Sequence, residues 1–213
     1  MIEILGVELD ALPSAFELTS LMDEKFLSAH RARHGLMRNE RAARASLAGL
    51  LLLQSTGVRG DLIYNENGRP SLLGESCDFN ITHTDAHTFC AVARPSAASE
   101  PCRLGLDAEN LSRLSHERVD RLAERWFSDA ENASFAADPT PEAFLRIWTR
   151  KEALLKWIGT GLVDLPHADT VCAEAFYNVR FVEYRMGDTL ITLCLAADAV
   201  APQEIRMLSA ETF

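Results

Sequence analysis

A polar segment at residues 94–101 (RPSAASEP) divides the chain into two parts that share the same kinds of predicted element. Small residues and flanking prolines are typical of a loop. On each side of this loop, amphipathic helical patterns accompany short alternating segments. We therefore expect an α+β fold of two similar subdomains, residues 1–101 and 102–213, with mostly antiparallel sheets and a cleft between them.

The first part contains two predicted helices. Residues 14–33 have the periodicity of a helix with an apolar face formed by Leu18, Leu21, Met22 and Phe26. Asn39 is suited to cap a second helix at residues 40–54, which Gly57 ends. Strands are expected at residues 2–9, 77–82 and 88–93, and the Asn-Gly pair within residues 65–70 predicts a tight turn.

The second part has a predicted strand at residues 103–109, followed by helices near residues 116–127, 129–136 and 140–159. In the last helix Thr140 can act as the cap, and Pro141 suits the first helical position. Residues 179–184 and 189–195 predict an antiparallel hairpin that turns at residues 186–188.

The charge balance is acidic. Lys and Arg number 21 against 31 Asp and Glu, which gives a formal charge of −10. This balance argues against broad binding to nucleic acid or to an anionic membrane. Residues 25–44 are an exception, because they carry six cations and the single acid Glu40, so an anionic ligand is expected there.

Cysteine usage and hydropathy indicate a reducing, cytoplasmic compartment. The five cysteines contain no C-x-x-C pair, and free cysteine in apolar runs behaves as a small hydrophobe. The N-terminus has no basic region typical of a signal peptide, and apolar runs such as residues 50–53 are far too short to span a bilayer.

The segment Gly105-Leu106-Asp107-Ala108-Glu109 is the first candidate for chemistry. Side chains two residues apart on a strand point the same way, so Asp107 and Glu109 project side by side. Mg²⁺ prefers such hard oxygen ligands together with substrate phosphates. Alone, this pattern also fits a strand end with solvated acids.

A second candidate lies in the helix at residues 140–159, where Glu152 and Lys156 are one turn apart on the same face. A carboxylate and an ammonium so placed could hold a metal and a phosphate together. Alone, the pair is equally an exposed ion pair worth about 0.3–0.5 kcal/mol.

Two weaker candidates lie in the first part. Thr82 and His83 follow an alternating strand and could donate hydrogen bonds to phosphate oxygens. Metal binding by His83 and His87 is not expected, since a four-residue spacing needs a helix and this segment predicts a strand and turn. Arg69, between Gly68 and Pro70, is a cation on a rigid turn.

These segments together resemble the surfactin-type family of 4′-phosphopantetheinyl transferases. The family motifs occur in order: G-[RK]-P at residues 68–70, F-N-x-S-H at 79–83, G-[IVL]-D-x-E at 105–109, W-[ST]-x-K-E-[AS]-x-x-K at 148–156 and G-x-G-L at 159–162. The resemblance covers about residues 30–165, and its last two long motifs are the most specific. It implies a pseudo-twofold pair of α+β halves with coenzyme A bound in the cleft between them.

The resemblance also implies roles for individual residues. Asp107, Glu109 and Glu152 match the magnesium ligands, with Mn²⁺ as an alternative ion, and Lys156 matches the lysine on the coenzyme A phosphates. Thr82 and His83 match a Ser-His pair near the pyrophosphate and 3′-phosphate, and Arg69 matches a basic residue near the adenylate. For the 3′-phosphate we favour Arg33 and Arg41 among the basic residues Arg33, Arg38, Arg41 and Arg44.

The implied reaction transfers 4′-phosphopantetheine from coenzyme A to a serine of an apo acyl or peptidyl carrier protein and releases 3′,5′-ADP. Glu152, Lys156 and Asp107 would be catalytic, with Glu152 as the base and Glu109 as its rival. The carrier would belong to fatty-acid, polyketide or non-ribosomal peptide synthesis, and the enzyme would be a monomer that binds neither nucleic acid nor membrane. The alternatives are a magnesium-dependent hydrolase of nucleotides or of the coenzyme A pyrophosphate, and a non-catalytic carrier-binding relative.

Two departures from the family pattern keep their chemistry: Thr82 replaces the usual serine and retains a hydroxyl, and Arg69 replaces the commoner lysine. The charge of −10 is less expected, because carrier proteins are themselves acidic. Docking must then depend on local basic or apolar patches.

Overall fold

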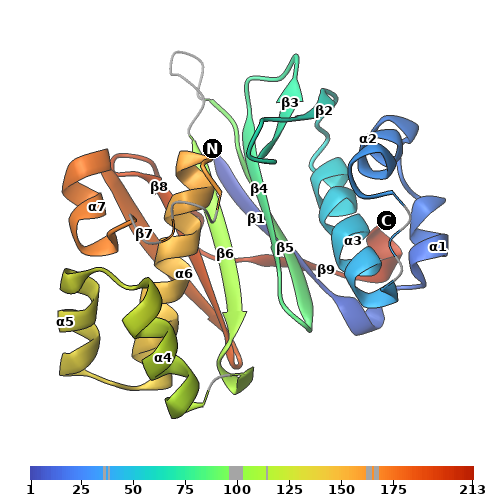
Figure 1. Cartoon of the computed structure of the whole chain (residues 1–213). Coiled ribbons are helices and arrows are strands. Elements are labelled where there is room, and N and C mark those ends of the chain that lie inside the picture. Colours follow the sequence, from blue (N-terminus) through green and yellow to red (C-terminus); the bar gives the residue numbers. More distant parts are fainter. Residues whose placement is uncertain (36, 38, 96–102, 114, 162–164, 166–167) are drawn as a thin grey trace. The chain divides into compact units, whose positions relative to one another are not determined.

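The computed structural model describes residues 1–35, 37, 39–95, 103–113, 115–161, 165 and 168–213. It consists of two compact units, Met1–Cys102 with Pro202–Phe213, and Arg103–Ala201. The sequence division assigned residues 202–213 to the second part. They belong instead to the first unit, because strand β9 (Arg206–Leu208) pairs in parallel with strand β1 (Ile2–Glu8), as Figure 1 shows in red and blue.

The first unit is built on a sheet in the order β4-β5-β1-β9. Strands β4 (Asp78–His83) and β5 (His87–Ala93) are antiparallel neighbours, and β5 is antiparallel to β1. Helix α3 (Glu40–Ser55) packs on one face of this sheet (Figure 1). Asn39 caps α3 by accepting a hydrogen bond from the Ala42 N–H, as its sequence predicts.

The prediction of a single helix at residues 14–33 is wrong. The chain forms two helices, α1 (Ala15–Thr19) and α2 (Glu24–His34), with a break between them. The side chain of Gln54 in α3 accepts a hydrogen bond from the Asp23 N–H (2.7 Å) and donates one to the Leu21 carbonyl (3.1 Å). These bonds satisfy backbone groups that a continuous helix would use, and Leu21 is accordingly 40% exposed instead of lying on the apolar face.

The turn predicted at residues 65–70 joins a hairpin of strands β2 (Asp61–Tyr64) and β3 (Pro70–Leu73), which the sequence did not indicate. Gly68 in this turn has φ of +83°, in the left-handed region that suits glycine. Short 3₁₀ turns, η1 (Leu9–Ala11) and η4 (Ala210–Thr212), complete the unit.

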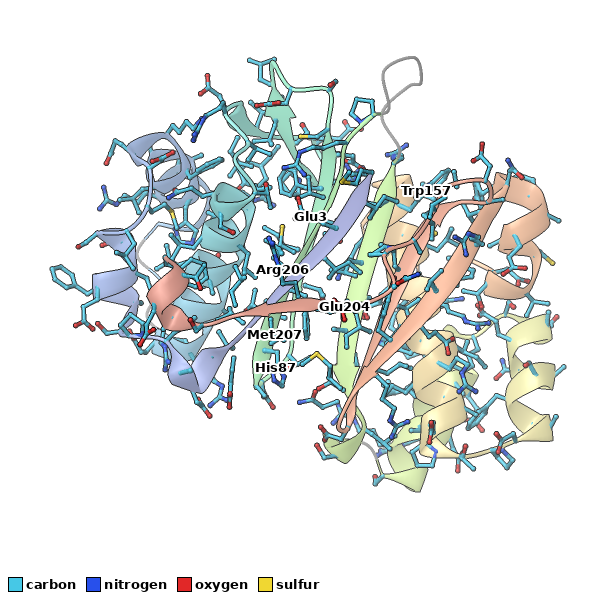
Figure 2. The ribbon with its side chains drawn as sticks, turned by 180° about the vertical axis from the view of Figure 1, so that it is seen from behind. Glu3, His87, Trp157, Glu204, Arg206 and Met207 are labelled. Carbon is cyan, nitrogen blue, oxygen red and sulfur yellow. The ribbon has the colours of Figure 1, made fainter. Side chains whose placement is uncertain are left out.

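Strand β9 lies close against β1 at Gly6. A Cβ atom at Gly6 would lie 2.6 Å from the Met207 sulfur and 2.8 Å from the Phe89 ring, so a larger residue would displace this packing. Arg206 lies 3.6 Å from a carboxylate oxygen of Glu3 (Figure 2). The pairing therefore joins the two ends of the sequence within one unit.

The second unit contains a sheet in the order β6-β8-β7, formed by β6 (Leu104–Asn110), β7 (Val179–Met186) and β8 (Thr189–Ala196). Helix α6 (Pro141–Ile158) packs against β6 and β8, where the buried hydroxyls of Thr149 and Thr192 lie 2.7 Å apart. Thr140 caps α6, as predicted, and Gly159 ends the helix in the left-handed conformation.

Among its described residues the unit also contains η2 (Leu111–Arg113), α4 (His116–Trp126), α5 (Asp129–Ala137) and α7 (Thr170–Tyr177), of which η2 and α7 were not predicted (Figure 1). The α+β class and the mainly antiparallel sheets are confirmed. Arg38, Leu162 and most of the predicted loop, residues 96–101, lie outside the described residues. Among the helices described, none combines the length and apolarity needed to cross a membrane.

Candidate active site

The close approach of helix α6 to strand β6 is set by Gly105. A Cβ atom at this position would collide with the Ala153 carbonyl oxygen and lie 2.6 Å from the Trp157 nitrogen, both in the α6 backbone. Because side chains alternate along a strand, Asp107 and Glu109 point to the same side as Gly105, toward α6. The glycine therefore lets the helix bring its own charged residues against these carboxylates.

Lys156 is the residue of α6 that meets Asp107. Its ammonium donates hydrogen bonds to Asp107 Oδ1 at 2.7 Å and to the Leu106 carbonyl at 3.0 Å. The Asp107 side chain is almost fully buried, whereas 29% of the Lys156 side chain is exposed. Burial lowers the pKa of Lys156, but Asp107 and Glu152 outweigh it and raise that pKa above its ordinary value.

Glu152, one turn earlier on α6, lies in the same electrostatic environment. Burial raises the pKa of its carboxyl group to about 8, and the charges of Asp107 and Glu109 contribute to the rise, while Lys156 opposes it. The structure thus brings together the acidic residues that the sequence placed on separate elements. It gives Glu152 an affinity for a proton well above that of an exposed glutamate.

A cavity of about 190 Å³ adjoins these carboxylates within the second unit. Glu109 and Glu152 line it together with Arg118 from α4 and an apolar wall of Leu122, Phe144, Leu145 and Trp148. Phe144 and Trp148 stack with ring centroids 5.7 Å apart. The sequence did not single out Arg118, because its position depends on how α4 packs against α6.

In the first unit, Arg33 and His83 line a cavity of about 240 Å³ with His30, Ser46 and Tyr64. The Arg33 guanidinium lies 5.0 Å from the centre of the Tyr64 ring and passes directly over Gly68, where a Cβ atom would collide with it. His30 Nε2 and Ser46 Oγ are 2.9 Å apart. His83 also lines a second cavity of about 200 Å³, together with Arg41.

The other predicted residues of the first unit have less accessible positions. Thr82 is buried and lines neither cavity. Arg69 forms two hydrogen bonds with the Asp78 carboxylate, at 3.0 and 2.7 Å, and both side chains are largely buried. Arg44 donates hydrogen bonds to the backbone carbonyls of Leu9 and Leu12. These contacts give Arg69 and Arg44 clear roles in holding the fold.

Lys151 precedes Glu152 in the sequence but points away from it into the core. Its ammonium donates to Glu131 Oε2 at 2.6 Å and to the Ala168 carbonyl, and the side chains of both Lys151 and Glu131 have no exposed surface. The other oxygen of Glu131 accepts hydrogen bonds from the Thr170 N–H and hydroxyl. This buried network joins α5, α6 and the start of α7, and sequence spacing alone did not indicate it.

The acidic residues fit a divalent cation in charge and in donor type. Asp107, Glu109 and Glu152 supply hard carboxylate oxygens, and the charges of Asp107 and Glu109 add to the effect of burial in raising the pKa of Glu152. Within the described part of the chain, however, no three His, Cys, Asp or Glu side chains are already arranged as a metal-binding group. Assignment of a metal to these residues is therefore a proposal.

Comparison with known proteins supports the family resemblance. The model of the 4′-phosphopantetheinyl transferase superfamily matches residues 103–185, which include β6 and α6 with their charged residues. This part of the chain is similar to that superfamily. The earlier resemblance to the surfactin-type family is thereby confirmed.

Three curated proteins illustrate what this chain is similar to. It is 30% identical to the 4′-phosphopantetheinyl transferase Gsp of Aneurinibacillus migulanus, over 58% of this chain and 52% of Gsp. It is 27% identical to Sfp of Bacillus subtilis, over 68% of this chain and 67% of Sfp. It is 32% identical to AcpT of Escherichia coli K12, over 58% of this chain and 62% of AcpT. The chain spans about half the length of Gsp and about two thirds of Sfp.

Proposed function

We propose that this chain transfers 4′-phosphopantetheine from coenzyme A to a serine of an apo acyl or peptidyl carrier protein and releases 3′,5′-ADP. The observation that carries the proposal is the convergence of Asp107, Glu152 and Lys156 where α6 crosses β6. Phosphoryl transfer depends mainly on positioning and on neutralising charge. Carboxylates beside an ammonium group and a semi-enclosed cavity suit that requirement.

Asp107, Glu109 and Glu152 would hold Mg²⁺, with Mn²⁺ as a substitute. The bound ion would neutralise charge on the pyrophosphate of coenzyme A. Lys156, tied to β6 by two hydrogen bonds, would stabilise charge on the departing 3′,5′-ADP phosphate. Its raised pKa keeps it cationic at neutral pH.

Glu152 would accept the proton of the attacking serine. Its carboxyl group lines the cavity of the second unit, which the carrier serine would enter. Glu109 lines the same cavity and is the alternative base.

The two units would then divide the recognition of coenzyme A. Arg33 and His83 line one cavity of the first unit, and His83 and Arg41 line another, so these residues are suited to the 3′-phosphate and adenylate. The Arg69–Asp78 pair would hold the turn that carries Gly68 and Pro70 beside the first cavity. The second unit would hold the cation and the reacting phosphate.

The carrier would dock on a basic face of α4. Arg118, Arg121 and Arg125 are exposed and lie three and four residues apart, on one side of the helix. Arg118 also lines the cavity with Glu109 and Glu152, so this face adjoins the proposed catalytic residues. It supplies the local positive charge that an enzyme with a net charge of −10 needs in order to bind an acidic carrier.

The decisive test is the intact mass of several apo carriers after incubation with coenzyme A and Mg²⁺. Wild-type protein should add one phosphopantetheine, whereas Glu152→Gln and Asp107→Ala should abolish the mass shift. Glu142→Gln, which removes an exposed acid of the same helix that pairs with Arg185, is the matched control and should retain activity. Transfer at the wild-type rate by either active-site variant would refute the assignment.

The same assay separates the two alternatives. A hydrolase of the coenzyme A pyrophosphate would release 3′,5′-ADP without a carrier, and a non-catalytic relative would bind the carrier without changing its mass. Arg121→Glu should raise the KM for the carrier without changing binding of coenzyme A, and Glu124→Gln on the same helix is the control. We expect a monomeric enzyme in the reducing cytoplasm, consistent with four described cysteines that are free.

A further inference from the structure

The Lys156 ammonium already occupies one oxygen of a proposed metal ligand. It donates to Asp107 Oδ1 at 2.7 Å and is held in place by a second hydrogen bond to the Leu106 carbonyl at 3.0 Å. Both acceptors belong to β6, so the lysine reaches across from α6 and is fixed at the strand by two contacts. In this arrangement Asp107 is neutralised by a side chain of the protein itself.

From this contact, and on the basis of the proposed function, we propose that Lys156 is a lock on the metal site. It engages Asp107 until coenzyme A supplies phosphate oxygens for its ammonium group, so that the divalent cation and coenzyme A bind cooperatively. Lys156 is thus a positioning residue for the metal site as well as a contact for the substrate.

The first argument is electrostatic. A divalent cation that binds Asp107 while Lys156 remains on Oδ1 lies beside another positive charge, and the repulsion between them is strong away from bulk water. The hydrogen bond from Lys156 at 2.7 Å also competes with a metal ion for the lone pairs of Asp107 Oδ1. Within the described residues, the acidic side chains do not form a group of three ligands while this contact is present.

The second argument concerns movement. The stem of Lys156 is a flexible four-carbon chain, and 29% of the side chain is exposed, so its ammonium can leave Asp107 without disturbing the helix. A phosphate is a suitable new partner, because lysine binds phosphate as a compact charge. Thermodynamic reciprocity then requires that the metal raise the affinity for coenzyme A by the same factor.

The two possible roles of Lys156, a lock on the metal site or a simple phosphate contact, predict different effects of its removal on the metal affinity of the free protein. If Lys156 only contacts phosphate, its removal weakens binding of coenzyme A and leaves the metal affinity of the free protein unchanged. If Lys156 is a lock, its removal tightens metal binding in the absence of coenzyme A. The sign of the change in metal affinity therefore distinguishes the two roles.

The test is a titration of wild-type and variant proteins with Mn²⁺, in which free Mn²⁺ is measured by electron paramagnetic resonance with and without coenzyme A. Protein-free samples correct for Mn²⁺ bound by coenzyme A itself. In wild type, coenzyme A should tighten Mn²⁺ binding about tenfold or more. Lys156→Met should tighten binding to the free protein by a similar factor and should reduce the effect of coenzyme A.

Two further variants complete the test. Lys156→Arg keeps the positive charge and should keep metal binding weak in the absence of coenzyme A, while Lys156→Gln serves as a second, polar replacement. Arg150→Gln is the matched control, since it removes one positive charge from the same helix but from a side chain that pairs with Glu183. Arg150→Gln should leave Mn²⁺ binding as in wild type.

Unchanged or weaker Mn²⁺ binding by both Lys156→Met and Lys156→Gln would overturn the lock. Equal tightening by Arg150→Gln would also overturn it, because a general change of charge would then explain the effect. The titration needs no carrier protein, so it is independent of the transfer assay. Cooperative binding without modification of any carrier would refute the proposed transferase and leave the lock intact, whereas transfer with the metal affinity unaltered would refute the lock alone.

Discussion

Replacement of Lys151 by methionine should destabilise the second unit strongly, although Lys151 takes no part in the proposed chemistry. Its ammonium and the Glu131 carboxylate form an ion pair of 2.6 Å, and neither side chain has exposed surface. Lys151→Met removes the cation and leaves the Glu131 carboxylate buried. The Glu131 carboxylate still accepts hydrogen bonds from Ser128 and Thr170, but these compensate its charge only in part.

Breaking a buried pair by removing one partner typically costs about 3–5 kcal/mol. That loss is a large fraction of the roughly 5–15 kcal/mol that stabilises an ordinary domain. The double variant Lys151→Met with Glu131→Gln leaves no unpaired charge, and glutamine can still accept the hydrogen bonds of Thr170. The double variant should therefore be more stable than Lys151→Met alone.

Urea denaturation followed by tryptophan fluorescence provides the assay. All three tryptophans, Trp126, Trp148 and Trp157, lie in the second unit and report its unfolding. Arg150→Met is the control from the neighbouring position, because its partly exposed pair with Glu183 should contribute about 1 kcal/mol or less. The reasoning would be refuted if Lys151→Met lowered the unfolding free energy by less than about 1 kcal/mol. It would also be refuted if the double variant were less stable than Lys151→Met alone.

Three further predictions concern other sites. Because the pKa of Glu152 is raised from 4.5 to about 8, the unfolding free energy of the metal-free protein should fall as the pH rises between these two values. Glu152→Gln should flatten this pH dependence in thermal melts made with a chelator. An unchanged slope in the variant would contradict the raised pKa. Gly105→Ala should cost about 1–3 kcal/mol in urea denaturation, because its Cβ would collide with the α6 backbone, and full stability would show that the helix can shift freely. Gly68→Ala should displace Arg33 and weaken binding of 3′,5′-ADP about tenfold in calorimetry. Gly74→Ala is the control, because Gly74 is also left-handed but has open space around it, and this variant should bind 3′,5′-ADP normally. Equal losses of affinity in both variants would exclude a role for Arg33.

The spacing of residues along a strand and along a helix predicted much of the candidate site. The spacing of Asp107 and Glu109 placed both on one face of a strand, and the spacing of Glu152 and Lys156 placed both on one face of a helix. Neither spacing could reveal that Gly105 lets the helix lie against the strand, nor that Lys156 bonds to Asp107. Those facts depend on which face of α6 meets β6, and that is decided by packing across about fifty residues of chain.

The sequence alone determined the class of fold, the caps of α3 and α6, and the faces on which the charged residues lie, because these follow from periodicity and from bonds between near neighbours. The tertiary structure decided which distant groups became partners: Gln54 breaks the first predicted helix, Asp78 binds Arg69, and Glu131 receives Lys151. It also joined β9 to β1 across almost the whole chain. Each of these outcomes comes from buried polar groups and strand edges that must find partners wherever the packed chain places them.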